Sequence, residues 1–204
     1  MRRTLPFAFA LVSFVAGCGD PDAGKLFVDI QYATRCDETL GCGGTEERDI
    51  CGINQGDPCI EGTPEVLASC SVSESESNRT VSFSAQQGAD FSIAVSGAIF
   101  PFAGGSASGG SCTVTVVDGP NTYSGACGSS EPSEAQPCQI SSVMFYDDMG
   151  NPTVEGSILC KNLSNRANPD LQIEVSTLGS GPDAANTPAG FRLANCTGLE
   201  VEGE

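Results

Sequence analysis

Cysteine is the residue type whose number and spacing most clearly indicate chemistry in this chain, which has 11 cysteines and no histidine. Five of them lie close together in the sequence: Cys36, Cys42, Cys51, Cys59 and Cys70. None of these forms a C-x-x-C pair, which is the spacing that thiolate metal sites and redox motifs typically have. If Cys18 is set aside, an even number remains and can pair completely. The pattern therefore predicts disulfides in an exported protein, with metal ligation as the weaker alternative.

The absence of histidine removes most familiar catalytic arrangements. Ser-His-Asp and Cys-His sites need an imidazole as proton shuttle near neutral pH, and most catalytic zinc sites use histidine ligands. A pair of carboxylates among the 26 acidic residues is what is left, as in glycoside hydrolysis. Sugar-cleaving clefts also use aromatic platforms, and the chain has no tryptophan and three tyrosines. We therefore expect a protein that is not an enzyme and binds no cofactor, with a carboxylate-dependent hydrolase as the alternative.

One short segment has the oxygen ligands that calcium prefers, namely Asp147-Asp148-Met149-Gly150-Asn151. The same residue types, followed here by Pro152, are also those that a hairpin turn requires. We favour the turn and predict no metal site.

The N-terminus has the features of an export signal. Met1-Arg2-Arg3 is basic, and the apolar run from Leu5 to Ala16 is shorter than the about 20 residues that span a bilayer. Its end, Val15-Ala16-Gly17-Cys18, resembles the lipobox of bacterial lipoprotein precursors. The resemblance implies that residues 1–17 are a signal peptide, and that Cys18 carries a diacylglycerol with acyl chains such as palmitate. Two alternatives stay open: an ordinary signal peptide that leaves Cys18 for a disulfide, and twin-arginine export.

Charge and the residue after Cys18 limit the partners and the location. The formal charge is −17, so binding to nucleic-acid phosphates is excluded, and attraction to anionic headgroups cannot hold the protein on a membrane. Lipid on Cys18 must therefore do the anchoring. Gly19 takes the position where an Asp would retain an enterobacterial lipoprotein at the inner membrane, so we expect the outer membrane, on its periplasmic or its surface face.

The elements that position these residues are predicted to be strands. Apolar residues alternate with polar ones along short segments separated by Gly, Pro, Asn, Asp and Ser, which is typical of half-buried strands. The apolar positions are Leu26, Val28, Ile30 and Tyr32; Val81, Phe83 and Ala85; Phe91, Ile93, Val95, Gly97 and Ile99; Cys112, Val114 and Val116; Val154, Gly156, Ile158 and Cys160; Leu171, Ile173 and Val175; and Phe191 and Leu193. We predict an all-β fold, an antiparallel two-sheet sandwich or jelly-roll-like domain braced by disulfides.

The division of the chain follows from these patterns. Residues 18–25 are expected to be a lipidated tether, and residues 26–199 the β-sandwich domain. A long Cys-rich loop is predicted at about 34–69, where periodicity is weak and Gly, Asp, Glu and Cys are frequent. Residues 200–204 are expected to form an acidic tail.

Two disulfides can be predicted from hairpin geometry. A turn centred between Gly119 and Pro120 sets three pairs of residues opposite each other: Val116 and Tyr123, Val114 and Gly125, Cys112 and Cys127. A turn centred on Met149 sets another three: Met144 and Val154, Ile140 and Ile158, Cys138 and Cys160. Opposed Cα atoms lie about 4.5–5.5 Å apart, within the about 4.4–6.8 Å that a disulfide accepts.

These positions predict the pairs Cys112–Cys127 and Cys138–Cys160. A bulge in either hairpin would break the match, and a bond between Cys127 and Cys138 is the competing possibility. The pairing of the other six is left open: Cys36, Cys42, Cys51, Cys59, Cys70 and Cys196.

Three functions are consistent with these sequence features. The first is an envelope lipoprotein that displays a β-sandwich binding or adhesion module for an unknown ligand, such as an envelope protein or polysaccharide. The second is a structural or assembly component that binds another envelope protein, and the third is the hydrolase.

Overall fold

A computed structural model describes residues 25–36, 44–53, 56–59, 61–107, 112–179 and 183–201 of the chain. The predicted signal peptide, Cys18 and most of the predicted tether lie outside these residues. The regular structure of the described part is almost entirely β-strand, with one three-residue 3-10 turn, η2 (Ala184–Asn186). The all-β prediction is confirmed. No helix in the described ranges is long and apolar enough to cross a membrane.

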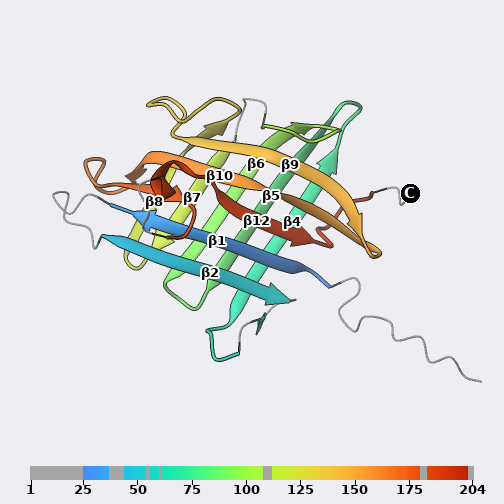
Figure 1. Cartoon of the computed structure of the whole chain (residues 1–204), viewed down its shortest axis with the longest axis horizontal. Coiled ribbons are helices and arrows are strands. Elements are labelled where there is room, and N and C mark those ends of the chain that lie inside the picture. The colour runs from blue at the N-terminus through green and yellow to red at the C-terminus, as the bar shows by residue number, and fades with distance from the viewer. Residues whose placement is uncertain are drawn as a thin grey trace, which may run out of the picture.

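Twelve strands make up this part of the chain (Figure 1). Their bounds are β1 Phe27–Arg35, β2 Thr45–Ile53, β3 Asp57–Pro58, β4 Val66–Glu74, β5 Asn78–Gln87, β6 Phe91–Pro101, β7 Thr113–Asp118, β8 Asn121–Gly128, β9 Cys138–Asp148, β10 Asn151–Asn165, β11 Gln172–Ser176 and β12 Ala189–Ala194.

The strands form one continuous sheet whose two halves lie over each other as a sandwich. Its order is β3-β2-β1-β11-β10-β9-β8-β7-β6-β5-β4, with β12 between β1 and β10. In Figure 1, β1, β2, β9, β10 and β12 form one layer and run across the strands β4 to β8 of the other. The halves join where β8 meets β9 in a parallel pair. The expected sandwich is therefore a single mixed sheet rather than two antiparallel sheets.

Two short strands share one place in the first layer. Both β11 and β12 are antiparallel to β1 on one side and to β10 on the other. Ser176 at the end of β11 pairs with Ala33, whereas Gly190 near the start of β12 pairs with Gln31. The chain between these strands therefore leaves the sheet and returns to nearly the same point.

Alternating apolar residues from both layers form the core between them. Val28, Ile30 and Tyr32 point inward from β1, and Phe83 of β5 meets Phe191 of β12 with ring centroids 5.1 Å apart. Serines fill many of the outward positions on β4 and β5, as expected for strands with one face in water.

The predicted long loop at 34–69 is wrong for much of its length, because it contains β2, β3 and the start of β4. β2 was missed because Glu46, Glu47, Arg48 and Asp49 are poor strand formers. Charged side chains are common on edge strands, where they discourage pairing with another chain. Arg48 faces inward, with its guanidinium 3.7 Å from the centroid of the Phe91 ring.

The acidic tail begins later than predicted. Leu199 is buried, and the carbonyl of Glu200 accepts a hydrogen bond from Arg79. Residues 202–204 lie outside the described part.

Candidate functional site

Two disulfides brace the place where the two layers of the sandwich join. Cys112–Cys127 and Cys138–Cys160 are both disulfides, with Cα atoms 5.0 and 4.1 Å apart. These are the two pairs expected from the hairpins, and Cys127 and Cys138 are unbonded neighbours in the parallel β8–β9 pair. The four cysteines thus form a row where one layer passes into the other.

The second hairpin reaches the expected pair by a different register. Its turn is the two residues Met149 and Gly150, so Met144 lies opposite Glu155 rather than Val154. A bulge at Ser142 then shifts the register by one residue, and Cys138 again faces Cys160. The expected bond is present because the error in the turn and the unforeseen bulge cancel.

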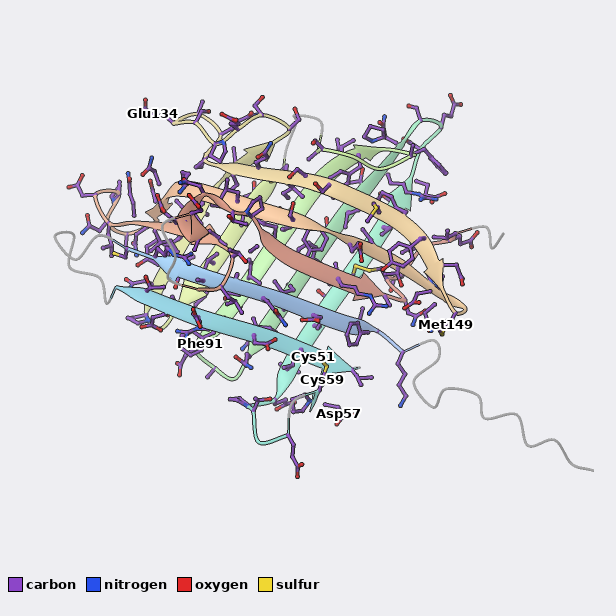
Figure 2. The ribbon with its side chains drawn as sticks, in the orientation of Figure 1. Cys51, Asp57, Cys59, Phe91, Glu134 and Met149 are labelled. Carbon is purple, nitrogen blue, oxygen red and sulfur yellow. A yellow bond between two sulfur atoms is a disulfide. The ribbon has the colours of Figure 1, made fainter. Side chains whose placement is uncertain are left out.

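The other described cysteines are paired as well. Cys70 of β4 is bonded to Cys196, which follows β12, so this disulfide joins the edge strand of the second layer to a strand that lies between β1 and β10 in the first. Cys51–Cys59 closes the short β2–β3 segment, at the lower edge of the molecule in Figure 2. Cys36 is disulfide-bonded, and Cys42 and the predicted lipidation site Cys18 lie outside the described residues.

The segment considered for calcium is a hairpin turn. The Asp147 carboxylate accepts a hydrogen bond from the Gly150 N–H at 2.7 Å, and the Asn151 side chain donates to the Asp148 carbonyl. Met149 and Gly150 both have positive φ, as this turn requires. In the described ranges, no group of three or more Asp, Glu, Cys or His side chains is placed to hold a metal ion.

The candidate ligand site is a groove of about 500 Å³ on the outer face of the first layer. Its floor comes from β1, β12, β10 and β9, and one wall comes from Thr177 and Leu178 of the segment that links β11 to β12. We call it the outer groove. Its remaining lining residues are Asp29, Gln31, Ser142, Met144, Glu155, Gly156, Ser157, Gly190, Phe191 and Arg192.

Strand register aligns these side chains in two rows across the layer. One row runs Asp29, Arg192, Glu155, Met144, because each of these residues is paired with the next. In the row beside it, Gln31 pairs with Gly190, which pairs with Ser157. Polar side chains from β1, β10 and β12 therefore lie together on the outer face, with Arg192 between Asp29 and Glu155 and with Gly190 between Gln31 and Ser157.

The wall of the groove is held by two basic residues. The Arg35 guanidinium donates to the Ser176 hydroxyl and to the carbonyls of Thr177 and Gly179. Lys161 donates to the Ala185 carbonyl and pairs with Glu174. Ala33 and Ser176 are fully buried although they face outward, which places this segment over them.

Arg192 is the cation of the groove, and it is already paired. Its Nη2 forms an ion pair with Asp148 at the end of β9. Its Nε is buried and has no hydrogen-bond partner. The guanidinium therefore leaves one donor unsatisfied.

The carboxylate of Asp29 is partly buried without a full set of hydrogen-bond partners. Its Oδ1 is buried and accepts no hydrogen bond, and the same holds for Oδ1 of Asp49 on β2. Burial raises the pKa of Asp29, the nearby Asp49 charge raises it further, and Arg192 opposes the shift. The position disfavours the charged carboxylate in the isolated protein.

On the opposite side of the groove, the carboxylate of Glu155 has a hydrogen-bond partner. The Tyr146 hydroxyl donates to Oε2 of Glu155 at 2.7 Å, and burial raises the pKa of Tyr146, with a further contribution from Glu155. Ser142 lies in the left-handed region with φ of 56°, at the bulge opposite Gly156. Bulges re-aim a side chain beside a site.

Two glycines shape the floor. A Cβ on Gly156 would lie 2.7 Å from atoms of both Phe191 and Val143, so no larger residue fits there. A Cβ on Gly190 would meet nothing within 4 Å. The space above Gly190 is therefore open, and a larger side chain at this position would fill it.

Sequence reasoning did not find the outer groove. Asp29, Gln31 and Arg192 look like ordinary outward positions of strands, and their convergence depends on β12 lying between β1 and β10. The one signal available was the charged Asp29 in an otherwise apolar or neutral segment.

Comparison with known proteins gives no match: no family model, no curated protein and no solved structure is similar enough to this chain to be matched to it.

Proposed function

We propose that this chain is an exported, lipid-anchored binding protein, held in the bacterial outer membrane through Cys18, whose ligand site is the outer groove. The anchor rests on the lipobox resemblance. The binding function is supported by one observation above all, which is that buried polar atoms of Asp29 and Arg192 lack partners beside an open floor. Such atoms are costly to leave unpaired, so folding stability alone does not account for these two side chains at the floor of the groove.

The alternative is a structural or assembly role, in which the same groove would hold another envelope protein permanently. The exposed Met144, at 53% exposure, gives the groove an apolar rim that suits a protein surface. The groove lies on an outer face of the sandwich, so a partner can reach it without opening the core.

One observation favours the hydrolase as a second candidate. Asp29, with its raised pKa, and Glu155 flank the same groove from strands on either side of β12. Two carboxyl groups in different environments are what glycoside hydrolysis uses. Among the described residues that line the groove, Phe191 alone is aromatic, and its ring is buried in the core, so it offers no platform for a sugar ring.

Capture of partners from detergent-solubilised envelope tests the binding function. Gly190→Phe should fill the groove without disturbing the fold, because a side chain there meets open space. Ser73→Phe, on the exposed outer side of β4, is the matched control. We expect a partner that wild type and Ser73→Phe retain and Gly190→Phe loses. Equal capture by all three would rule out the outer groove as the binding site.

A further inference from the structure

The second layer of the sandwich has an outer face without charge. The outward side chains of β4 to β8, which we call the hydroxyl face, are mostly Ser and Thr and include no Asp, Glu, Lys or Arg. The charged residues of these strands, Glu74, Arg79 and Asp118, take inward positions near strand ends, and Glu76 and Asp90 lie in the turns. Charged residues are 17% of the chain and belong mostly on surfaces, so several would be expected on this face.

Strand register makes the hydroxyl face a continuous surface of small side chains. Along one row Ser69, Ser84, Ala94, Thr115 and Ser124 each pair with the next, so the row crosses the whole layer. The hydroxyls of Ser69 and Ser84 lie 2.8 Å apart and share a hydrogen bond. Serine is not among the residues that strands favour, and edge strands such as β4 commonly have charged side chains that discourage pairing. Strand formation therefore does not explain the composition of this face.

The outer face of the first layer has the opposite character. Five carboxylates point outward from β1, β2, β10 and β11, namely Asp29, Glu47, Asp49, Glu155 and Glu174. A surface of anionic headgroups repels a face of this kind. The formal charge of the chain is −17, so the hydroxyl face is the side that can approach such a surface with the least repulsion.

The proposed anchor lies close to the sandwich in sequence. Cys18 precedes Lys25, which leads into β1, by seven residues. An extended chain of that length spans at most about 25 Å, and packed sheets lie about 10 Å apart. A lipid on Cys18 therefore holds the domain near the membrane and can reach it past either layer, which leaves charge to decide the side that faces the lipid.

We propose that the hydroxyl face lies against the phospholipid headgroups of the membrane that holds the anchor, an inference that rests on the proposed lipidation of Cys18. Ser and Thr hydroxyls donate and accept hydrogen bonds, so they can bind headgroup phosphates and ester carbonyls without adding like charge. The acyl chains supply the affinity, and the hydroxyl face determines the orientation. The outer groove then points away from the membrane, where a partner can reach it.

Energy transfer from an introduced tryptophan tests this orientation, because the chain has no tryptophan of its own. The mature protein is placed in vesicles of phosphatidylethanolamine and phosphatidylglycerol that contain a lipid with a dansyl headgroup. Ser71→Trp, at an exposed position of the hydroxyl face, should transfer energy at least about twofold more efficiently than Met144→Trp on the outer face of the first layer, because packed sheets lie about 10 Å apart. Equal transfer from both, or more from Met144→Trp, would overturn the inference.

Two pairs of added acids test the role of charge. With the Ser71→Trp probe in place, Ser69→Glu/Ser73→Glu should lower energy transfer about twofold or more in these anionic vesicles, and less in neutral phosphatidylcholine vesicles. Gln31→Glu/Thr45→Glu adds the same charge at exposed positions of the first layer and should leave the transfer unchanged. An equal loss from both pairs, or an equal loss in neutral vesicles, would contradict the inference.

Vesicle flotation keeps this inference apart from the anchor on which it rests. If the mature protein does not float with the vesicles, the lipidation of Cys18 and the orientation are both wrong. If it floats and the two probes transfer energy equally, the anchor is correct and the orientation alone is wrong. A benzophenone amino acid at Ser71 that crosslinks to a second copy of the chain rather than to lipid would show a dimer interface, and would likewise contradict the inference.

Discussion

Asp29 is the residue whose environment is hardest to explain by folding alone. Its carboxylate is partly buried, has an unpartnered Oδ1, and lies near the like charge of Asp49. An Asn at this position would keep the shape, remove the charge, and offer an amide to Asp49. A charged residue that lowers stability where a neutral one would serve is typical of a functional site.

We therefore expect Asp29→Asn to raise the free energy of unfolding at pH 7 by up to about 1 kcal/mol, reduced by partial solvent screening. Because the pKa of Asp29 is raised in the folded state, its protonation favours folding. The gain from Asn should then shrink as the pH falls through this raised pKa, and it should be lost below the ordinary value of 3.8 for an Asp carboxyl. Urea unfolding at pH 7 and pH 3 measures both effects.

Asp57→Asn is the control for this experiment, since Asp57 is exposed on β3 at the lower edge in Figure 2. It removes the same charge without a burial penalty and should change stability by less than about 0.5 kcal/mol. A destabilised Asp29→Asn protein would mean that the carboxylate has a structural role.

At the scale of elements, the segment between β11 and β12 determines whether the groove has a wall. Arg35→Ala removes three hydrogen bonds from a cationic donor, to Ser176, Thr177 and Gly179. We expect a loss of about 1–2 kcal/mol in the free energy of unfolding, faster amide exchange at residues 177–179, and weaker capture of the envelope partner. Arg166→Ala, at an exposed position outside this segment, should leave all three unchanged.

The strands of the core could be predicted because their apolar residues alternate, whereas β2 could not. Its inward positions are Arg48, Ile50 and Gly52, and only Ile50 gives an apolar signal. A Cβ on Gly52 would lie 2.6 Å from Val66, so packing of β2 against β4 selects the small residue. The residue types at these inward positions are explained by contacts with Phe91 and Val66, which are brought close only when the chain folds.

The outer groove escaped prediction for the same reason. Hairpin register between neighbouring strands can be counted along the chain, and it gives the Cys112–Cys127 pair directly. The same count reaches Cys138–Cys160 only because the misplaced turn and the bulge at Ser142 cancel. The groove instead depends on β12 inserting between β1 and β10, far from β1 in sequence. Nothing local to Gly190 or Arg192 indicates that insertion.

For the whole molecule, the disulfides differ in what they hold together. Cys70–Cys196 spans 126 residues and links the two layers, whereas Cys112–Cys127 spans 15 within one hairpin. Loop closure predicts losses of about 4–5 kcal/mol for the double Ala variant of the first pair and about 3 kcal/mol for that of the second. Urea midpoints compare the two, and a greater loss from Cys112/Cys127 would show that packing of these buried cysteines outweighs chain entropy.

Anchoring is a property of the whole molecule as well. If Cys18 carries lipid, Cys18→Ala should move the protein from the membrane fraction to the soluble envelope fraction or block its maturation. The intact mass of the extracted wild type should correspond to a chain starting at Cys18 with two or three acyl chains. An unmodified chain starting at Gly17 or Gly19 would refute the anchor while leaving the groove untouched.

Whether the outer groove meets a partner in the envelope is tested most directly by site-specific photocrosslinking in living cells. A benzophenone amino acid at Met144, on the rim of the groove, should give a discrete crosslinked band that Gly190→Phe abolishes. The same probe at Leu67, a similarly exposed position on the other layer at 44% against 53% for Met144, should give none. A band of equal intensity from both positions, or one that Gly190→Phe leaves intact, would contradict a binding role for the groove.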